Sequence, residues 1–225
     1  MNAQVWGPKC WDVLFSACYL MDPKETCSIL ECMRQLLPCT HCRRSFDMLC
    51  ARMKQDSCIT TPEQAAKWLW VVHDYVNSKL GKGKANIPYH IISARHATFT
   101  CYISMWDPID MLSIITMQME TEQEALSYAT LAPLFCRLSV LCGAPSSVCV
   151  AVNELHLSPA TCWLHSLSCK NAIRKNLGLS EQSRNDLKRQ IEVSQATPST
   201  TSSVAVATNK GNRPLRTRPS RKRGR

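Results

Sequence analysis

Cys39 and Cys42 are separated by two residues and directly follow Pro38. An apolar stripe after them, through Phe46 and Leu49, predicts a helix that begins at the first cysteine. Residues three apart in a first helical turn have Cα atoms about 5 Å apart, a distance at which a disulfide can close. The pair is therefore predicted to be a redox dithiol.

The expected position of this dithiol also favours its thiolate form. The unpaired backbone N–H groups and the dipole at a helix N-terminus stabilise negative charge on sulfur. Arg43 and Arg44 follow directly and are expected to add positive charge. Both effects predict sulfur atoms that react.

A second group of polar residues lies about thirty residues later. His73 and Asn77 are one helical turn apart, so they share a helix face, and Lys79 and Lys82 follow them. Taken alone, His73 fits an ordinary histidine on a helix surface. Lys79 and Lys82 likewise fit the solvated charges that commonly end a helix.

Metal binding is the alternative use of the cysteines. Cys39, Cys42, Cys50 and Cys58 have a spacing compatible with a zinc site, with His41 as a further ligand. The alternative function is then a zinc-stabilised helical protein that binds nucleic acid through a basic tail.

The elements that must position these residues are helices. Apolar periodicity predicts helices over residues 8–20, 24–36, 39–53 and 62–80, followed by a short one near 88–97. Thr61 and Gln64 form a capping box before the fourth helix, and Gly81 ends it. We expect an all-α protein whose residues 1–100 form a four-helix bundle with a short fifth helix.

The rest of the chain divides at changes of composition. Residues 101–179 have helical periodicity, with breaks at Gly143 and Ser158, and are predicted to form an additional helical domain. Residues 180–225 are rich in Ser, Thr, Pro and Arg, and we expect them to form a disordered basic tail.

Charge is concentrated in this tail. The net charge is +10, yet residues 181–225 hold eleven Lys or Arg against three Asp or Glu. We expect the tail to make weak nucleic-acid contacts or to act as a nuclear localisation signal. We predict no membrane span and no cleaved leader, and therefore a cytoplasmic or nuclear location.

Three motifs occur in order along the first half of the chain. They are Trp6-Gly7-Pro8-x-x-Trp11-x-x-Leu14, Pro38-Cys39-x-x-Cys42-Arg43-x-x-Phe46, and Trp68-x4-His73-Asp74-x-Val76-Asn77-x-Lys79-Leu80-Gly81-Lys82. Their order and spacing resemble the Erv/ALR family of FAD-linked sulfhydryl oxidases over roughly residues 5–97. The layout, with an added C-terminal helical region, resembles sulfhydryl oxidases of large DNA viruses, which implies a viral protein in host cytoplasm or virion.

The resemblance implies a homodimeric enzyme that makes disulfides in protein dithiol substrates. Cys39 would exchange with substrate thiols, and Cys42 would be the cysteine next to the flavin. Electrons would pass from the dithiol to FAD and then to O₂, giving H₂O₂. The implied FAD-binding residues are Gly7, Trp11, Phe15, His73, Asp74, Asn77, Lys79, Lys82, Arg95 and His96.

Some positions depart from the family pattern. Phe15 stands where the family usually has His, Asp74 where it has Asn, and His96 where it has Trp. Trp70 and Ile87 occupy the positions of the family's structural disulfide.

Other cysteines are candidates for a shuttle dithiol or for the apolar core. Cys27 with Cys32, or Cys101 with a partner, are candidates for a shuttle dithiol. Cys142 and Cys149, like Cys162 and Cys169, are seven residues apart, about 10.5 Å along a straight helix, which is too far for a disulfide. They are predicted to face the core, although pairing of Cys162 or Cys169 with another helix stays open.

Overall fold

The computed structural model describes residues 3–53, 59–81, 87–97, 103–148 and 158–196. Within these ranges the regular elements are all helices, which confirms the predicted all-α class. In chain order they are α1 (Ala3–Leu20), α2 (Pro23–Leu36), α3 (Thr40–Arg52), α5 (Pro62–Lys79), α6 (Tyr89–Ala97), α7 (Asp107–Thr116), α8 (Glu122–Leu141), the 3₁₀ turn η1 (Ser146–Val148), α9 (Pro159–Asn176) and α10 (Arg184–Ala196).

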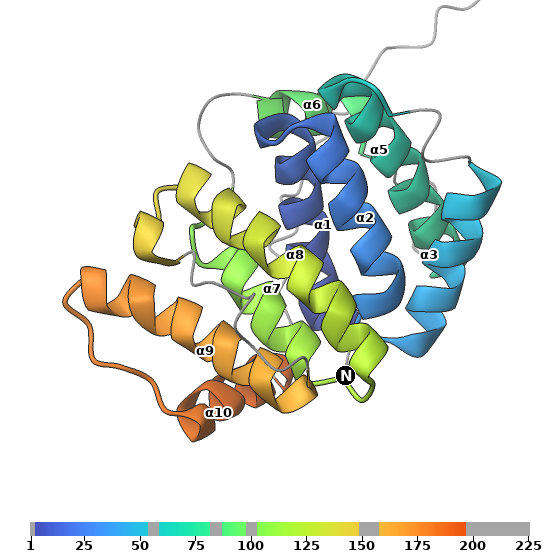
Figure 1. Ribbon diagram of the computed structural model, residues 1–225. Coiled ribbons are helices and arrows are strands. Elements are labelled where there is room, and N and C mark those ends of the chain that lie inside the picture. The colour runs from blue at the N-terminus through green and yellow to red at the C-terminus, as the bar shows by residue number, and fades with distance from the viewer. Residues whose placement is uncertain (1–2, 54–58, 82–86, 98–102, 149–157, 197–225) are drawn as a thin grey trace, which may run out of the picture.

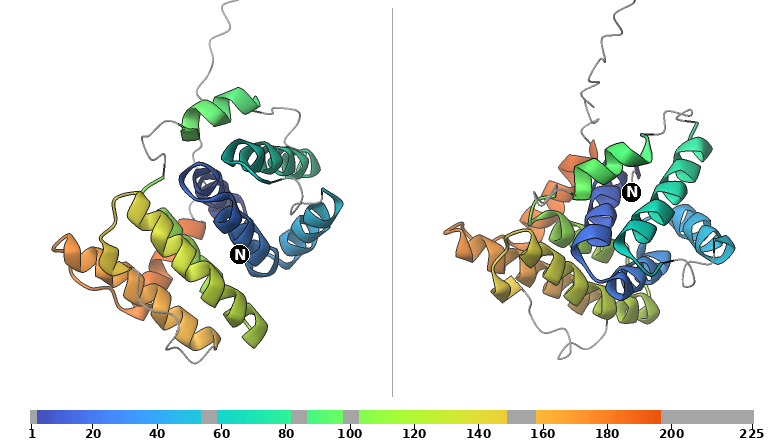
Figure 2. Two further views of the ribbon diagram at one scale, coloured as in Figure 1. Left: turned by 45° about the horizontal axis from the view of Figure 1, so that its top comes forward. Right: turned by 90° about the horizontal axis from the view of Figure 1, so that it is seen from above.

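Four helices, α1, α2, α3 and α5, form the predicted bundle (Figure 1). The short helix α6 packs against α1 and α5 and closes one side of the bundle, as the two turned views in Figure 2 show. It has nine residues, Tyr89–Ala97, at the place where a short helix was predicted. Tyr89 at its start places its hydroxyl 3.3 Å from that of Tyr19 on α1.

Local sequence explains where the bundle helices begin and end. Thr61 accepts a hydrogen bond from the backbone of Gln64, whose side chain caps in return, so the predicted capping box is confirmed. Asp22 and Glu25 form a second capping box, at the start of α2. Gly81 follows α5 with φ +67°, a left-handed conformation that glycine adopts without strain.

The later helices pack onto the bundle through one continuous apolar core. Helix α8 lies along α2, and α7 contacts α1, α8 and α9 (Figure 1). Most buried apolar side chains from α1 to α9 belong to a single cluster, while Trp163 of α9 packs in a smaller one with α10. Division of the chain into domains at residue 100 therefore stays a prediction, since both parts contribute to the same core.

Ion pairs reinforce this junction. Lys9 Nζ on α1 lies 3.0 Å from Asp107 and 2.9 Å from Asp110, both on α7. Lys170 Nζ on α9 lies 2.7 Å from the other oxygen of Asp110. Burial opposes ionisation of Asp110, but the two ammonium groups outweigh it and lower the pKa of this carboxyl.

The tail prediction was wrong for its first part. Residues 184–196 form α10, in which Leu187 and Ile191 are buried against Trp163 of α9. The helix is short and mostly polar, so composition pointed to disorder, whereas two apolar residues one turn apart are enough to dock it. Residues 197–225, the rest of the predicted tail, lie outside the described residues.

In the described part of the chain, no helix combines the length and apolar character that a bilayer crossing requires.

Candidate functional site

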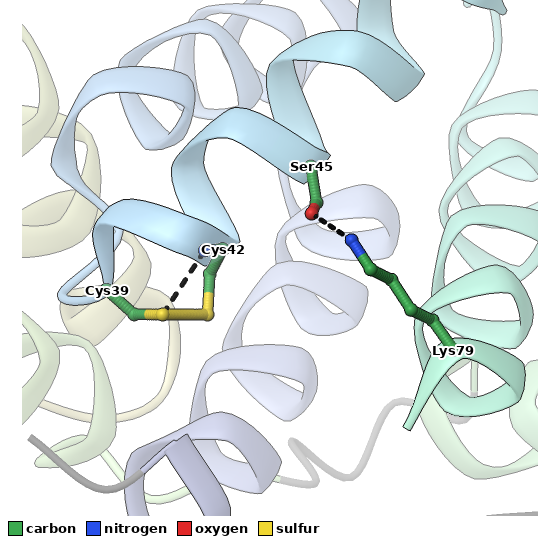
Figure 3. Close-up of a disulfide and its surroundings, with 4 residues drawn as sticks. All are labelled: Cys39, Cys42, Ser45 and Lys79. Carbon is green, nitrogen blue, oxygen red and sulfur yellow. Dashed lines mark hydrogen bonds between the residues drawn. A yellow bond between two sulfur atoms is a disulfide. The ribbon is translucent and has the colours of Figure 1, made fainter. Parts of the chain in front are cut away.

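The predicted dithiol is a disulfide at the start of α3. Cys39 is the N-cap of this helix, its Cα lies 5.1 Å from that of Cys42, and the two sulfurs are bonded (Figure 3). The Cys42 backbone N–H donates to Cys39 Sγ at 3.2 Å. Both residues are half-buried: reagents in solution can reach them, and the rest of each side chain packs against the bundle.

The positive charge beside the dithiol is partly neutralised. Arg43 forms an ion pair with Glu124 of α8 and also donates to the Gln35 carbonyl at 3.1 Å. Burial opposes ionisation of Glu124, but hydrogen bonds from the backbone of Glu120 and Thr121 and from Arg43 lower the pKa of its carboxyl. Arg43 therefore anchors α3 to α8, and exposed Arg44 retains its charge without a described partner carboxylate.

Aromatic rings from three helices gather in the bundle. The Trp11 ring of α1 lies 4.7 Å from the His73 ring of α5, centroid to centroid. Phe15, one turn after Trp11, contacts His73 edge-on at 6.1 Å and stacks on His96 of α6 at 5.4 Å. The structure thus brings together four of the residues that the sequence assigned to flavin.

Polar residues extend this cluster along α5. Asn77 Nδ2 lies 3.2 Å from His73 Nε2, so the predicted pairing of these two side chains on one helix face is confirmed. Lys79, near the end of α5, donates from Nζ to Ser45 Oγ at 2.7 Å, one turn after Cys42 (Figure 3). This contact joins the polar end of α5 to the helix that carries the dithiol.

His96 is held neutral at the other side of the cluster. Its Nδ1 lies 3.3 Å from Ser16 Oγ, and Asp12 Oδ1 lies 3.9 Å from its Nε2. Burial and the neighbouring Arg95 lower its pKa to about 4. Arg95 itself is 3.8 Å from Asp12.

Sequence reasoning missed Asp12, Ser16 and Ser45. Asp12 and Ser16 are one turn apart on α1, so their position on the face of Trp11 and Phe15 was the available signal. Ser45 had no such signal, because its contact depends on how α3 packs beside α5.

Two predicted flavin residues gain no support. Gly7 lies on α1 one turn before Trp11, and a Cβ built there would meet nothing within 4 Å, so no close approach requires a glycine. Lys82 lies outside the described residues.

The described residues fit a flavin nucleotide, which has a flat aromatic ring system, hydroxyl groups and two phosphates. Trp11 and His73 are half-buried and offer aromatic surface, whereas Phe15 is buried against His73 and His96, and the Lys79 ammonium suits phosphate oxygens. Asp74 Oδ1 is buried without a hydrogen-bond partner among the described residues. A hydroxyl or amino group of a bound nucleotide would supply the missing donor.

The zinc alternative has no support in the described residues. Cys39 and Cys42 are bonded to each other, so they cannot both act as thiolate ligands. No cluster of three or more metal-binding side chains occurs in the part of the chain that the structure describes. Cys58, one of the proposed ligands, lies outside that part.

The shuttle candidates are also constrained. Cys27 and Cys32 both lie on α2 and line a cleft of about 430 Å³ between α2 and α8. Five residues apart, they are separated by about 7.5 Å along the helix axis, so they cannot pair with each other while α2 is intact. Cys101 lies outside the described residues.

The prediction that Cys142 faces the core as a thiol was wrong. It forms a disulfide in the structure. Helix α8 ends at Leu141 and Cys142 is its C-cap, so the assumption of one straight helix through both cysteines did not hold. Cys149 lies outside the described residues.

Comparison with known proteins identifies one family. No curated protein and no solved structure matches this chain. Residues 10–96, which hold the disulfide, the aromatic cluster and the polar end of α5, match the model of the Erv1 / Alr family. Over these residues the chain is therefore similar to the Erv1/Alr family, which supports an oxidase of the Erv/ALR sulfhydryl type.

Proposed function

We propose that the protein oxidises dithiols of protein substrates to disulfides through Cys39 and Cys42. The observation that carries this proposal is the half-buried disulfide at the N-terminus of α3. A disulfide in this position can be attacked from solvent, and the backbone N–H groups around it stabilise a departing thiolate.

The exchange requires two displacements at sulfur. A substrate thiolate attacks Cys39 Sγ, the bond between Cys39 and Cys42 breaks, and Cys42 leaves as a thiolate. The second substrate thiolate then attacks the substrate sulfur of the mixed disulfide and releases Cys39. The substrate gains one disulfide, and the protein is left with a dithiol that holds the two electrons.

The geometry supports Cys39 as the exchanging residue. In the disulfide form the Cys42 N–H donates to Cys39 Sγ, and the same N–H would donate to this sulfur when it carries negative charge. It therefore stabilises Cys39 as the leaving group of the second displacement. Cys42 lies nearer to Ser45 and Lys79 along α3, which supports its assignment to the flavin side (Figure 3).

A bound FAD would accept the two electrons from the dithiol and pass them to O₂, giving H₂O₂. Trp11 would pack on its ring system, and His73 and Asn77 would contact its adenosine part. Phe15, buried against His73, would support that ring, and Lys79 would face the phosphates, with Asp74 near the same end. His96, kept neutral by burial, would pack at the edge of this site without adding charge.

Peroxide production with a reduced protein substrate tests the function. Wild-type protein should generate H₂O₂ and substrate disulfides in equal amounts, and Cys39→Ser and Cys42→Ser should lose at least about 100-fold of this activity, since neither variant can form the disulfide. Cys162→Ala, a buried cysteine of α9, is the matched control and should keep it. Undiminished activity in both serine variants would overturn the mechanism.

Homodimer formation stays a prediction from the family resemblance, as do the viral origin and the contact of the basic tail with nucleic acid. Light scattering during gel filtration tests the dimer directly. A mass of one chain at micromolar concentration would contradict it.

A further inference from the structure

A second pair of cysteines lies between α8 and α9, in the part of the chain beyond the family match. Cys136 Sγ on α8 and Cys169 Sγ on α9 are 3.6 Å apart, although 33 residues separate them in sequence. Their exposed fractions are 1% and 0%. Both are thiols in the structure, and their sulfurs are already in van der Waals contact.

Other reactive side chains surround this pair. His165, one turn before Cys169, has ring nitrogens 3.7 and 3.8 Å from the Cys169 sulfur. The Tyr128 hydroxyl of α8 lies 2.9 Å from His165 Nδ1. Burial, with the nearby Cys169, Cys162 and Cys136, raises the pKa of Tyr128 well above its usual value. Tyr128 is therefore a neutral phenol.

We propose that Cys136 and Cys169 form a further disulfide of this protein, in addition to that of Cys39 with Cys42 and that of Cys142. The sulfurs must approach by about 1.5 Å to reach bonding distance, which small rotations of two side chains on adjacent helices provide. The oxidant is a disulfide of the glutathione type. Two S–H bonds and the oxidant's S–S bond break, one S–S bond forms, and two thiols of the oxidant are released.

His165 is placed to assist this step. If Nδ1 carries the hydrogen and donates it to the Tyr128 oxygen, Nε2 is left as an acceptor 3.7 Å from the Cys169 sulfur. During folding, as α9 forms and before burial closes off the oxidant, it can take the thiol proton, so that Cys169 attacks the oxidant as a thiolate. Cys136 then displaces the bound half of the oxidant and completes the bond.

The bond would fasten α9 to α8. Helix α9 carries Lys170, which pairs with Asp110 of α7, and α8 carries Glu124, which holds Arg43 beside Cys42. The disulfide would therefore connect α9 covalently to α8, the helix that holds Arg43 at the start of α3. It would also restrict the unfolded chain by closing a loop of 33 residues.

Peptide mapping after oxidative refolding tests the proposal. Full-length protein is unfolded and reduced, then refolded with oxidised and reduced glutathione, so that burial does not limit access of the oxidant. The remaining thiols are alkylated before digestion without reductant. We expect a peptide joined through Cys136 and Cys169, and modified Cys162 in the same sample.

Thermal unfolding provides the second measurement. In wild-type protein, oxidation should raise Tm by roughly 5–10 °C more than in Cys136→Ala or Cys169→Ala. Cys162→Ala is the control, because it removes a buried thiol from the same helix and should keep the full wild-type increase. Because neither readout needs flavin or turnover, failure of this proposal is distinguishable from failure of the oxidase function.

Two results would overturn the proposal. One is alkylation of Cys136 and Cys169 in refolded protein whose Cys39–Cys42 bond is fully oxidised. The other is a linkage of either residue to a different cysteine.

Discussion

Lys79 donates a hydrogen bond from Nζ to Ser45 Oγ at 2.7 Å, and this contact ties the end of α5 to the helix of the dithiol. The two residues are 34 positions apart in sequence. Ser45 is one turn after Cys42, and Lys79 is half a turn after Asn77. The ammonium group of Lys79 therefore connects the helix of the redox pair to the helix that carries His73 and Asn77.

Replacing Lys79 by Met should weaken FAD binding about three- to tenfold, because a positive charge facing the phosphates is lost. Fluorescence titration of apoprotein with FAD measures the dissociation constant. Lys67→Met is the control, since Lys67 is exposed on the same helix and pairs only with Glu63 among the described carboxylates. Equal weakening in both variants would assign the effect to overall charge.

Replacing Trp11 by Ala should lower FAD affinity about tenfold or more, because the largest ring of the aromatic cluster is removed. Trp11→Phe keeps an aromatic face and should retain most of the binding. The flavin-to-protein ratio after gel filtration reports the difference. If Trp11→Ala retains a full equivalent of flavin, Trp11 is a core residue with no part in the site.

His96 should make stability fall on acidification. Burial and Arg95 lower its folded pKa to about 4, below the value of about 6.5 in an unfolded chain. The unfolded state therefore binds the proton first. The stabilisation is fully present above about pH 6.5 and is lost as the pH falls towards 4, and it amounts to roughly 2–3 kcal/mol.

Urea unfolding at pH 7 and pH 4.5 checks this dependence. The free energy of unfolding of wild-type protein should fall by about 2 kcal/mol more than that of His96→Gln, which has no imidazole to protonate. His90→Gln, an exposed change on the same helix, should behave as wild type. An identical fall in wild type and His96→Gln would contradict the role of His96.

The Arg43–Glu124 ion pair should affect how readily the Cys39–Cys42 disulfide is reduced. Glu124→Gln keeps the cap of α8 but removes the charge that neutralises Arg43. The freed guanidinium should stabilise the thiolate forms of Cys39 and Cys42, so the disulfide should be reduced about two- to tenfold more readily at equilibrium. Redox titration against dithiothreitol, followed by alkylation, measures this constant. Glu122→Gln, exposed in the same turn, should leave it unchanged; a shift as large as that of Glu124→Gln would disprove the specific coupling.

Local features of the fold could be predicted from sequence because short-range rules control them. Thr61 and Gln64 are three residues apart, and Cys39 and Cys42 share one helical turn, so their contacts follow from helix geometry alone. Motif order pointed to Trp11, His73 and Asn77 as candidate flavin contacts, and the structure brings these three side chains together.

Long-range packing was not accessible in the same way. The contact of Arg43 with Glu124 and that of Cys136 with Cys169 both depend on which helix α8 packs against. Apolar periodicity predicts which face of α8 is buried, but it does not predict which helix packs against that face. For the same reason, the packing of Leu187 and Ile191 of α10 against Trp163 could not be predicted from a segment that is otherwise polar.

The visible absorption spectrum of the purified protein, before and after anaerobic dithiothreitol, tests the central claim most directly. The proposed mechanism predicts a flavin spectrum that bleaches on reduction and returns when air is admitted. In Cys42→Ser the flavin should stay bound but should bleach far more slowly, because the dithiol no longer delivers electrons. A folded wild-type protein that remains colourless after incubation with excess FAD, or whose flavin does not respond to dithiothreitol, would contradict it.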